Sequence, residues 1–136
     1  MADSLMRLFD ISGSAMSAQT VRLNTIASNV ANANHVNRSA SGSFQALKAL
    51  FEARYAEDGS LSGVEVTDIV TANQEPIKEF NPQHPMADTE GYIYRTPVNI
   101  IEELTDSMSA NRALEVNAYL MESGKKMIER ILQLGN

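Results

Sequence analysis

The chain has 136 residues, of which 11 are basic and 17 acidic, so its formal net charge is −6. Nucleic acids and anionic membranes repel such a chain on average, so we expect neither as a partner. The absence of cysteine excludes a disulfide framework and a thiolate metal site. No run approaches the roughly 18 apolar residues that span a bilayer, and the first residues lack the pattern of a cleaved signal peptide.

The N-terminal region predicts one long helix over residues 5–34. Apolar residues recur at seven-residue steps, and a second set lies at the companion position of the same stripe. The stripe consists of Phe9, Met16, Leu23 and Val30, with Leu5, Ile26 and Ala33 beside them. Asn32, Asn34 and Asn37 then favour a turn. A stripe of this length is typical of a helix that packs along a partner.

The other sides of this predicted helix are small and uncharged. From Ile11 to Asn34 the only charged residue is Arg22. A two-helix coiled coil in water normally carries Glu and Lys beside its seam. One interpretation is a Ser- and Asn-rich surface helix without a special role. The other is a helix packed on several sides by neighbouring subunits and poorly ordered before assembly.

A second long helix is predicted over residues 99–134. Its apolar residues follow a spacing of three and four, and Gly135 is placed to end the helix. The predicted stripe consists of Ala110, Ala113, Leu120, Met127, Ile131 and Leu134, completed by Asn117 and Gly124. Basic residues lie in the last turns, where they complement the negative end of a helix.

Between the helices, residues 39–97 predict a small β-rich and irregular region that holds most of the acidic charge. Alternating valines predict a strand near residues 64–70, and a turn at residues 88–91 precedes another. Residues 44–55 fit a strand and a helix equally well. The predicted fold is therefore mainly α, with domains at 1–38, 39–97 and 98–136, the first and last forming one α domain.

No active site is predicted. His35 and His84 are the only histidines and lack acidic neighbours at metal-ligand spacing. No Gly-x-Ser-x-Gly elbow or Gly-rich phosphate loop occurs. Glu102 and Glu103 lie in a helical first turn, where negative charge is ordinary. We expect no catalytic residue, no cofactor and no metal ion.

Four segments resemble the bacterial flagellar axial family, which includes rod and hook proteins. Residues 18–34 contain the Leu-Asn and Ala-Ser-Asn-x-Ala-Asn-Ala signature, and residues 85–93 resemble a Pro-x-Ala-Asp-x-x-Gly-Tyr element of one proximal-rod subfamily. Residues 108–117 and 126–135 are similar to the family's C-terminal blocks. Two departures are Pro97, displaced by one residue before the second helix, and Leu114, where Tyr is usual.

The resemblance implies a structural subunit of the periplasmic rod in the flagellar basal body, which transmits torque from motor to hook. It also implies other rod proteins and copies of the chain as partners, and export through the flagellar type III apparatus without a cleaved signal. A soluble helical adaptor or chaperone with an amphipathic groove is the alternative.

For a rod subunit we expect the two terminal helices to pair as an antiparallel coiled coil. The expected seam residues are Phe9, Met16, Leu23, Ile26, Val30, Leu120, Met127 and Ile131. The expected polar contacts between subunits are Gln19, Asn24, Asn29, Asn32, Arg112 and Asn117.

Overall fold

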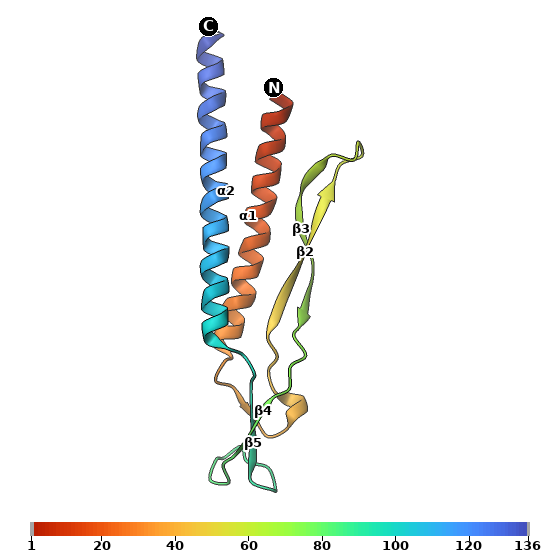
Figure 1. Cartoon of the computed structure of the whole chain (residues 1–136), viewed down its shortest axis with the longest axis vertical. Coiled ribbons are helices and arrows are strands. Elements are labelled where there is room, and N and C mark those ends of the chain that lie inside the picture. Colours follow the sequence, from red (N-terminus) through yellow and green to blue (C-terminus); the bar gives the residue numbers. More distant parts are fainter. Residues whose placement is uncertain (1, 136) are drawn as a thin grey trace. The chain divides into compact units, whose positions relative to one another are not determined.

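The computed structural model describes residues 2–135 and contains two long helices with a small β region between them in the sequence (Figure 1). The elements in chain order are α1 (Ala2–Ala31), β1 (Val36–Asn37), the 3-10 turn η1 (Ala40–Gly42), β2 (Leu47–Tyr55), β3 (Leu61–Thr71), β4 (Ile77–Phe80), β5 (Tyr92–Arg95) and α2 (Ile100–Leu134). Both predicted helices are confirmed, α1 with bounds about three residues earlier than expected. The ambiguous segment 44–55 contains strand β2.

The chain divides into two compact units, each built from segments that are separate in the sequence. Unit 1 comprises the described residues within 1–23, 49–68 and 108–136, and unit 2 comprises 24–48 and 69–107. Each unit therefore draws on all three regions that the sequence suggested as domains. The outermost residues of those regions, Met1 and Asn136, lie outside the described part of the chain.

In unit 1 the N-terminal part of α1 contacts both α2 and the hairpin of β2 and β3. Gly124 of α2 lies so close to α1 that a Cβ there would be 3.2 Å from Phe9 Cζ and 3.3 Å from Leu8 Cδ2. The hairpin closes through the Ala56 N–H, which donates to the Ser60 carbonyl at 2.9 Å. The absence of a side chain at Gly124 thus permits close approach of the two helices.

Unit 2 contains a three-stranded antiparallel sheet in the order β1-β5-β4. Asp88 starts the predicted turn before β5, because its carboxylate accepts the N–H groups of Glu90 and Tyr92 at 2.9 and 2.8 Å. The rings of Phe80 and Tyr92 pack edge to face at 5.2 Å across β4 and β5. These contacts confirm the predicted turn and strand at residues 88–94.

Helix α2 begins with an Asn cap despite the displaced Pro97. The Asn99 side-chain oxygen accepts the Ile101 N–H at 3.0 Å, which is the usual capping bond. Three residues earlier the Thr96 hydroxyl donates to the Phe44 carbonyl at 2.9 Å and anchors the approach to the helix. The start of α2 is therefore fixed within unit 2.

The buried apolar core is small. Among the described residues it consists of Ala18, Ile26, Ala33, Ala46, Ile93 and Ala110, four of which are alanines. Among the same described residues, twenty large apolar side chains are exposed, and eleven of these lie on α2. Neither described long helix is apolar enough over a sufficient length to cross a membrane.

Candidate subunit interface

The exposed side of α1 is narrow, small and uncharged along most of its length. Its exposed residues from position 17 to the end of the helix are Ser17, Thr20, Asn24, Ala27 and Ala31. All of them recur at spacings of three or four, so they form one continuous stripe. We call these five residues the small-residue stripe. Backbones can approach closely over such a surface because no long side chain keeps them apart.

The covered side of α1 carries the apolar residues that the sequence assigned to a seam. Ile26 is buried, and Phe9, Met16, Leu23 and Val30 are half-buried. Phe9 also lines a shallow apolar groove of about 510 Å³ with Met121 and Ile128 of α2. Phe9 therefore contacts α2 of the same chain.

Buried and half-buried residues of helix α2 form a stripe with heptad spacing, which we call the covered stripe. The stripe consists of buried or half-buried residues that step by four and three alternately: Glu103, Ser107, Ala110, Leu114, Asn117, Met121, Gly124 and Ile128. This is the seam spacing of a coiled coil, although several members are small or polar. Small residues at the seam bring neighbouring helices close together.

A second apolar stripe on α2 is exposed. It consists of Val116, Leu120, Met127, Ile131 and Leu134, and we call it the α2 apolar stripe. Leu120, Met127 and Ile131 each lie three residues after a member of the covered stripe, which places them about 60° from it around the helix. The structure thus places the expected seam residues Leu120, Met127 and Ile131 on the exposed side.

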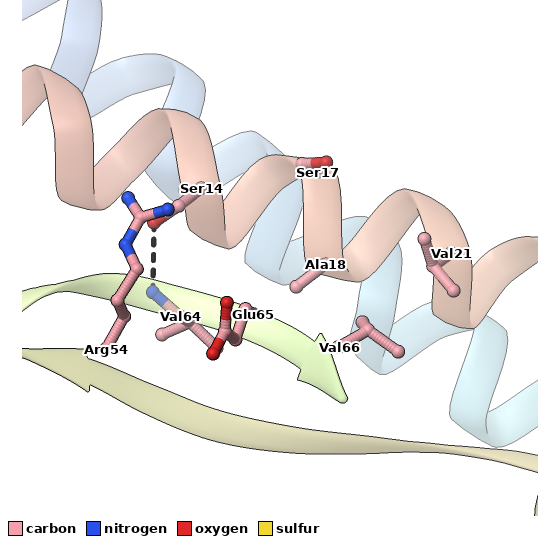
Figure 2. Close-up of a pocket in the computed structure, with 8 residues that line it drawn as sticks. All are labelled: Ser14, Ser17, Ala18, Val21, Arg54, Val64, Glu65 and Val66. Atoms are coloured by element: carbon pink, nitrogen blue, oxygen red, sulfur yellow. Dashed lines mark hydrogen bonds between the residues drawn. The ribbon is translucent and has the colours of Figure 1, made fainter. Parts of the chain in front are cut away.

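The β2–β3 hairpin docks on α1 through one shared hydroxyl (Figure 2). Ser14 Oγ donates to the Ile11 carbonyl at 2.9 Å and accepts the Val64 N–H at 3.0 Å. Gly63 lies against the same side chain, and a Cβ at Gly63 would collide with Ser14 Oγ. Sequence reasoning missed this contact. A glycine beside alternating valines was the available signal, since glycine in a strand often marks close backbone approach.

Beside this contact, α1 and the hairpin enclose a pocket of about 350 Å³. Val64 and Val66 of β3 face Ala18 and Val21 of α1, and the Arg54 side chain of β2 closes one end (Figure 2). Arg54 Nε donates to Ser62 Oγ at 3.1 Å within the hairpin. The lining combines small apolar side chains with two serines, Arg54 and Glu65, and among these residues there is no histidine or cysteine.

In unit 2 the Asn29 side chain connects α1 to the start of β2 and to α2 through hydrogen bonds. Its Oδ1 accepts the Leu47 N–H at 2.7 Å, and its Nδ2 donates to the Leu47 carbonyl at 2.9 Å and to Glu103 Oε2 at 3.0 Å. The residue is only 1% exposed. Its hydrogen-bonding groups are therefore used inside the chain, although the sequence suggested Asn29 as a contact between subunits.

The other suggested contacts lie in different environments. Asn32 and Asn117 are half-buried, and each donates to a carbonyl four residues earlier in its own helix at 2.8 Å. Gln19 accepts a hydrogen bond from Arg22 at 3.5 Å. Asn24 and Arg112 are exposed. Of the six, these last two are the most accessible to a neighbouring subunit.

Several exposed charges form local pairs. The pKa of Asp58 is lowered, first by the Ser60 hydroxyl, then by the Ser60 N–H and by Arg7, whose guanidinium lies 3.1 Å away. The Lys126 ammonium, 2.7 Å from Glu122, lowers the pKa of that carboxyl. Within residues 2–135 no group of three or more metal-ligating side chains comes together. The site geometry is that of a packing surface.

Two family models match the ends of the chain, where α1 and α2 lie. The model for flagella basal body rod protein matches residues 9–38, and the model for the C-terminal part of flagellar basal body rod FlgEFG protein matches residues 89–134. Long terminal helices with exposed small and apolar stripes, together with these matches, define the class as flagellar rod proteins.

Curated relatives give the family within this class. The chain is 33% identical over 132 residues to flagellar basal-body rod protein FlgC of Escherichia coli O6:H1 and of Salmonella typhimurium, covering 97% of this chain and 98% of each relative. It is 27% identical over 148 residues to FlgC of Borreliella burgdorferi, covering 96% of this chain and 97% of the relative. The chain belongs to the FlgC family of basal-body rod proteins.

This membership confirms the resemblance seen in the sequence. It also decides between the two functions that the sequence left open, in favour of a structural rod subunit of the flagellar basal body over a soluble adaptor. The relatives are structural rod proteins, so the chain is not an enzyme.

Proposed function

We propose that the chain occupies the proximal rod, where it assembles helically with other rod proteins and with copies of itself to transmit motor torque across the periplasm to the hook. One observation carries this proposal: in the described part of the chain twenty large apolar side chains are exposed, whereas the buried apolar core contains two isoleucines and four alanines. Monomers rarely leave so much apolar surface in water. Burial between subunits supplies what the chain's own core lacks.

The terminal helices pair as an antiparallel coiled coil in this proposal. Its support is the heptad spacing of the covered α2 residues and the contact of Gly124 with Phe9 and Leu8. The α2 apolar stripe then faces a neighbouring subunit, and the small-residue stripe of α1 faces another. Asn24 and Arg112 supply polar contacts that fix the register between subunits.

The proposal also includes export of the subunit before it assembles. The subunit leaves the cytoplasm through the flagellar type III apparatus without a cleaved signal, and it reaches the rod before its helices are enclosed. In the periplasm its acidic middle region stays in contact with water.

The test introduces charge on the small-residue stripe. Asn24→Glu and Ala31→Lys are each expected to block rod completion, because an enclosed charge without a partner is strongly unfavourable. The matched control is Glu57→Lys at the exposed hairpin turn, which changes charge at a solvated position. Swimming and electron microscopy of isolated basal bodies provide the measurement. Normal rods with both stripe variants would contradict the proposal.

A further inference from the structure

The two ends of α2 carry exposed apolar groups of complementary form. At the start of the helix, unit 2 has a hollow of about 580 Å³ whose apolar lining is Ala33, Ile77, Pro97, Val98, Ile100 and Ile101. Ile77 and Ile101 are 56% and 75% exposed, so this lining is open to solvent. We call this hollow the head pocket.

At the end of the helix, unit 1 presents an apolar projection. Ile131, Leu132 and Leu134 are 41%, 64% and 88% exposed, so three apolar side chains of the last turn lie in solvent. We call these three residues the tail knob. Exposed apolar clusters often mark a surface that binds another protein.

The charges around these two groups are opposite in sign. Residues 100–107 carry Glu102, Glu103 and Asp106 and no basic residue, which gives −3. Residues 125–134 carry Lys125, Lys126 and Arg130 against Glu129, which gives +2. At the head, Arg95 is neutralised by Glu79 at 3.2 Å. Glu103 is buried and accepts a hydrogen bond from Asn29, so the exposed carboxylate next to Ile101 of the head pocket is Glu102. At the other end Arg130 is exposed and precedes Ile131 of the tail knob.

Glu102 and Arg130 are the charges best placed to meet. Both are exposed, and neither forms an ion pair within residues 2–135. By contrast, Lys126 already pairs with Glu122. Opposite potentials select partners and fix register between protein surfaces.

We propose that the tail knob of one copy of this chain inserts into the head pocket of a second copy, with Arg130 of the inserting chain beside Glu102 of the receiving chain. The occupant is a second copy because the chain itself carries both complementary surfaces. The two surfaces differ, so the contact is heterologous and each copy can accept the next. This inference rests on the proposed rod function and specifies one contact within it.

The test uses cysteine pairs, which the chain permits because it has no native cysteine. Ile101→Cys and Leu132→Cys are placed on separate, differently tagged copies in cells that lack the native protein. Basal bodies are isolated and oxidised, and disulfide-linked dimers are measured. A disulfide requires Cα atoms within about 7 Å, so it reports direct contact. The control pairs Leu132→Cys with Ala53→Cys on the hairpin.

The expected result is about tenfold more dimer from the Ile101 pair than from the control pair, the excess that corresponds to a specific contact. Equal yields from the two pairs overturn the inference. Charge reversal gives a second measurement that needs no disulfide. Glu102→Arg or Arg130→Glu alone should lower incorporation into basal bodies about fivefold, and the double reversal should restore it. Failure of the double reversal to restore incorporation also overturns the inference.

The outcomes separate this inference from the proposed function. If Asn24→Glu blocks rod completion while the Ile101 pair links no better than its control, only the head-to-tail contact is wrong. If Asn24→Glu and Ala31→Lys leave rods normal, the proposal that neighbouring subunits cover α1 is wrong. This conclusion does not depend on the result from the cysteine pairs.

Discussion

The Asn29 side chain bonds to both backbone groups of Leu47, at 2.7 Å to its N–H and 2.9 Å to its carbonyl. A neighbouring strand would make the same two bonds, so a helical side chain takes the place of a strand at the start of β2. The bond from Asn29 Nδ2 to Glu103 Oε2 extends this arrangement to α2. One amide thereby connects three segments that are far apart in the sequence.

Asn29→Asp should destabilise unit 2 by about 3 kcal/mol. The substitution removes both donated bonds and places a carboxylate beside Glu103, so two buried acceptors lose their donor. Hydrogen exchange at the Leu47 amide should become about 100-fold faster. Adding Glu103→Gln should recover part of the loss, since its amide can donate to the new carboxylate.

The matched control for this experiment is Asn32→Asp. Asn32 Nδ2 donates only to the Ser28 carbonyl of its own helix end, so the expected change is below about 1 kcal/mol. Equal effects at positions 29 and 32 would show that the bonds to Leu47 and Glu103 contribute little.

Gly63→Ala should loosen the hairpin from α1 by about 1–3 kcal/mol. The new Cβ collides with Ser14 Oγ and lies 3.2 Å from Arg54 Nη2, so the hairpin must shift. Exchange of the Val64 amide, which donates to Ser14, reports the loss. Thr67→Ala, at an exposed position of the same strand, is the control and should leave this exchange unchanged.

Gly13→Ala should stabilise α1 by about 1 kcal/mol. A Cβ at position 13 meets nothing within 4 Å, so the substitution adds helix propensity without a clash. Circular dichroism of the purified chain should show a higher helix content and a higher Tm. An unchanged or lower helix content would mean that residue 13 is not helical in the free chain.

Acid should weaken the hairpin turn through Asp58. Its pKa is lowered from the ordinary value of 3.8, chiefly by the hydrogen bond from the Ser60 hydroxyl. A lowered pKa means that the carboxylate stabilises the fold above pH 3.8, and that this contribution is lost as the pH falls through the folded value. NMR titration of the Asp58 carboxyl checks the shift. Ser60→Ala should raise that pKa, whereas Ser41→Ala should not.

The helices could be predicted from the sequence because apolar spacing is periodic, but the covered side of α2 could not. The predicted stripe contains Asn117 and Gly124 together with Leu120 and Met127, and the expected seam takes the larger, more apolar pair. The structure instead covers the smaller pair, because a glycine lets Phe9 approach closely. Spacing alone does not decide which members of this broad stripe lie closest to α1.

The docking contacts were harder to predict because they depend on residues distant in the sequence. Asn29 looked like a surface residue since its neighbours are polar and small, yet its partners at positions 47 and 103 lie 18 and 74 residues away. Residues 44–55 remained ambiguous for the same reason. Only pairing with β3 selects the strand.

The alanine-rich core also bears on how the subunit is delivered. Among the described residues the buried apolar core has two isoleucines and four alanines, so an isolated subunit loses little apolar burial when it unfolds. In the proposed type III export route, a chain that unfolds easily suits passage through a narrow channel. In the proposed rod, the stiffness that transmits torque comes from the contacts that each subunit forms with its neighbours.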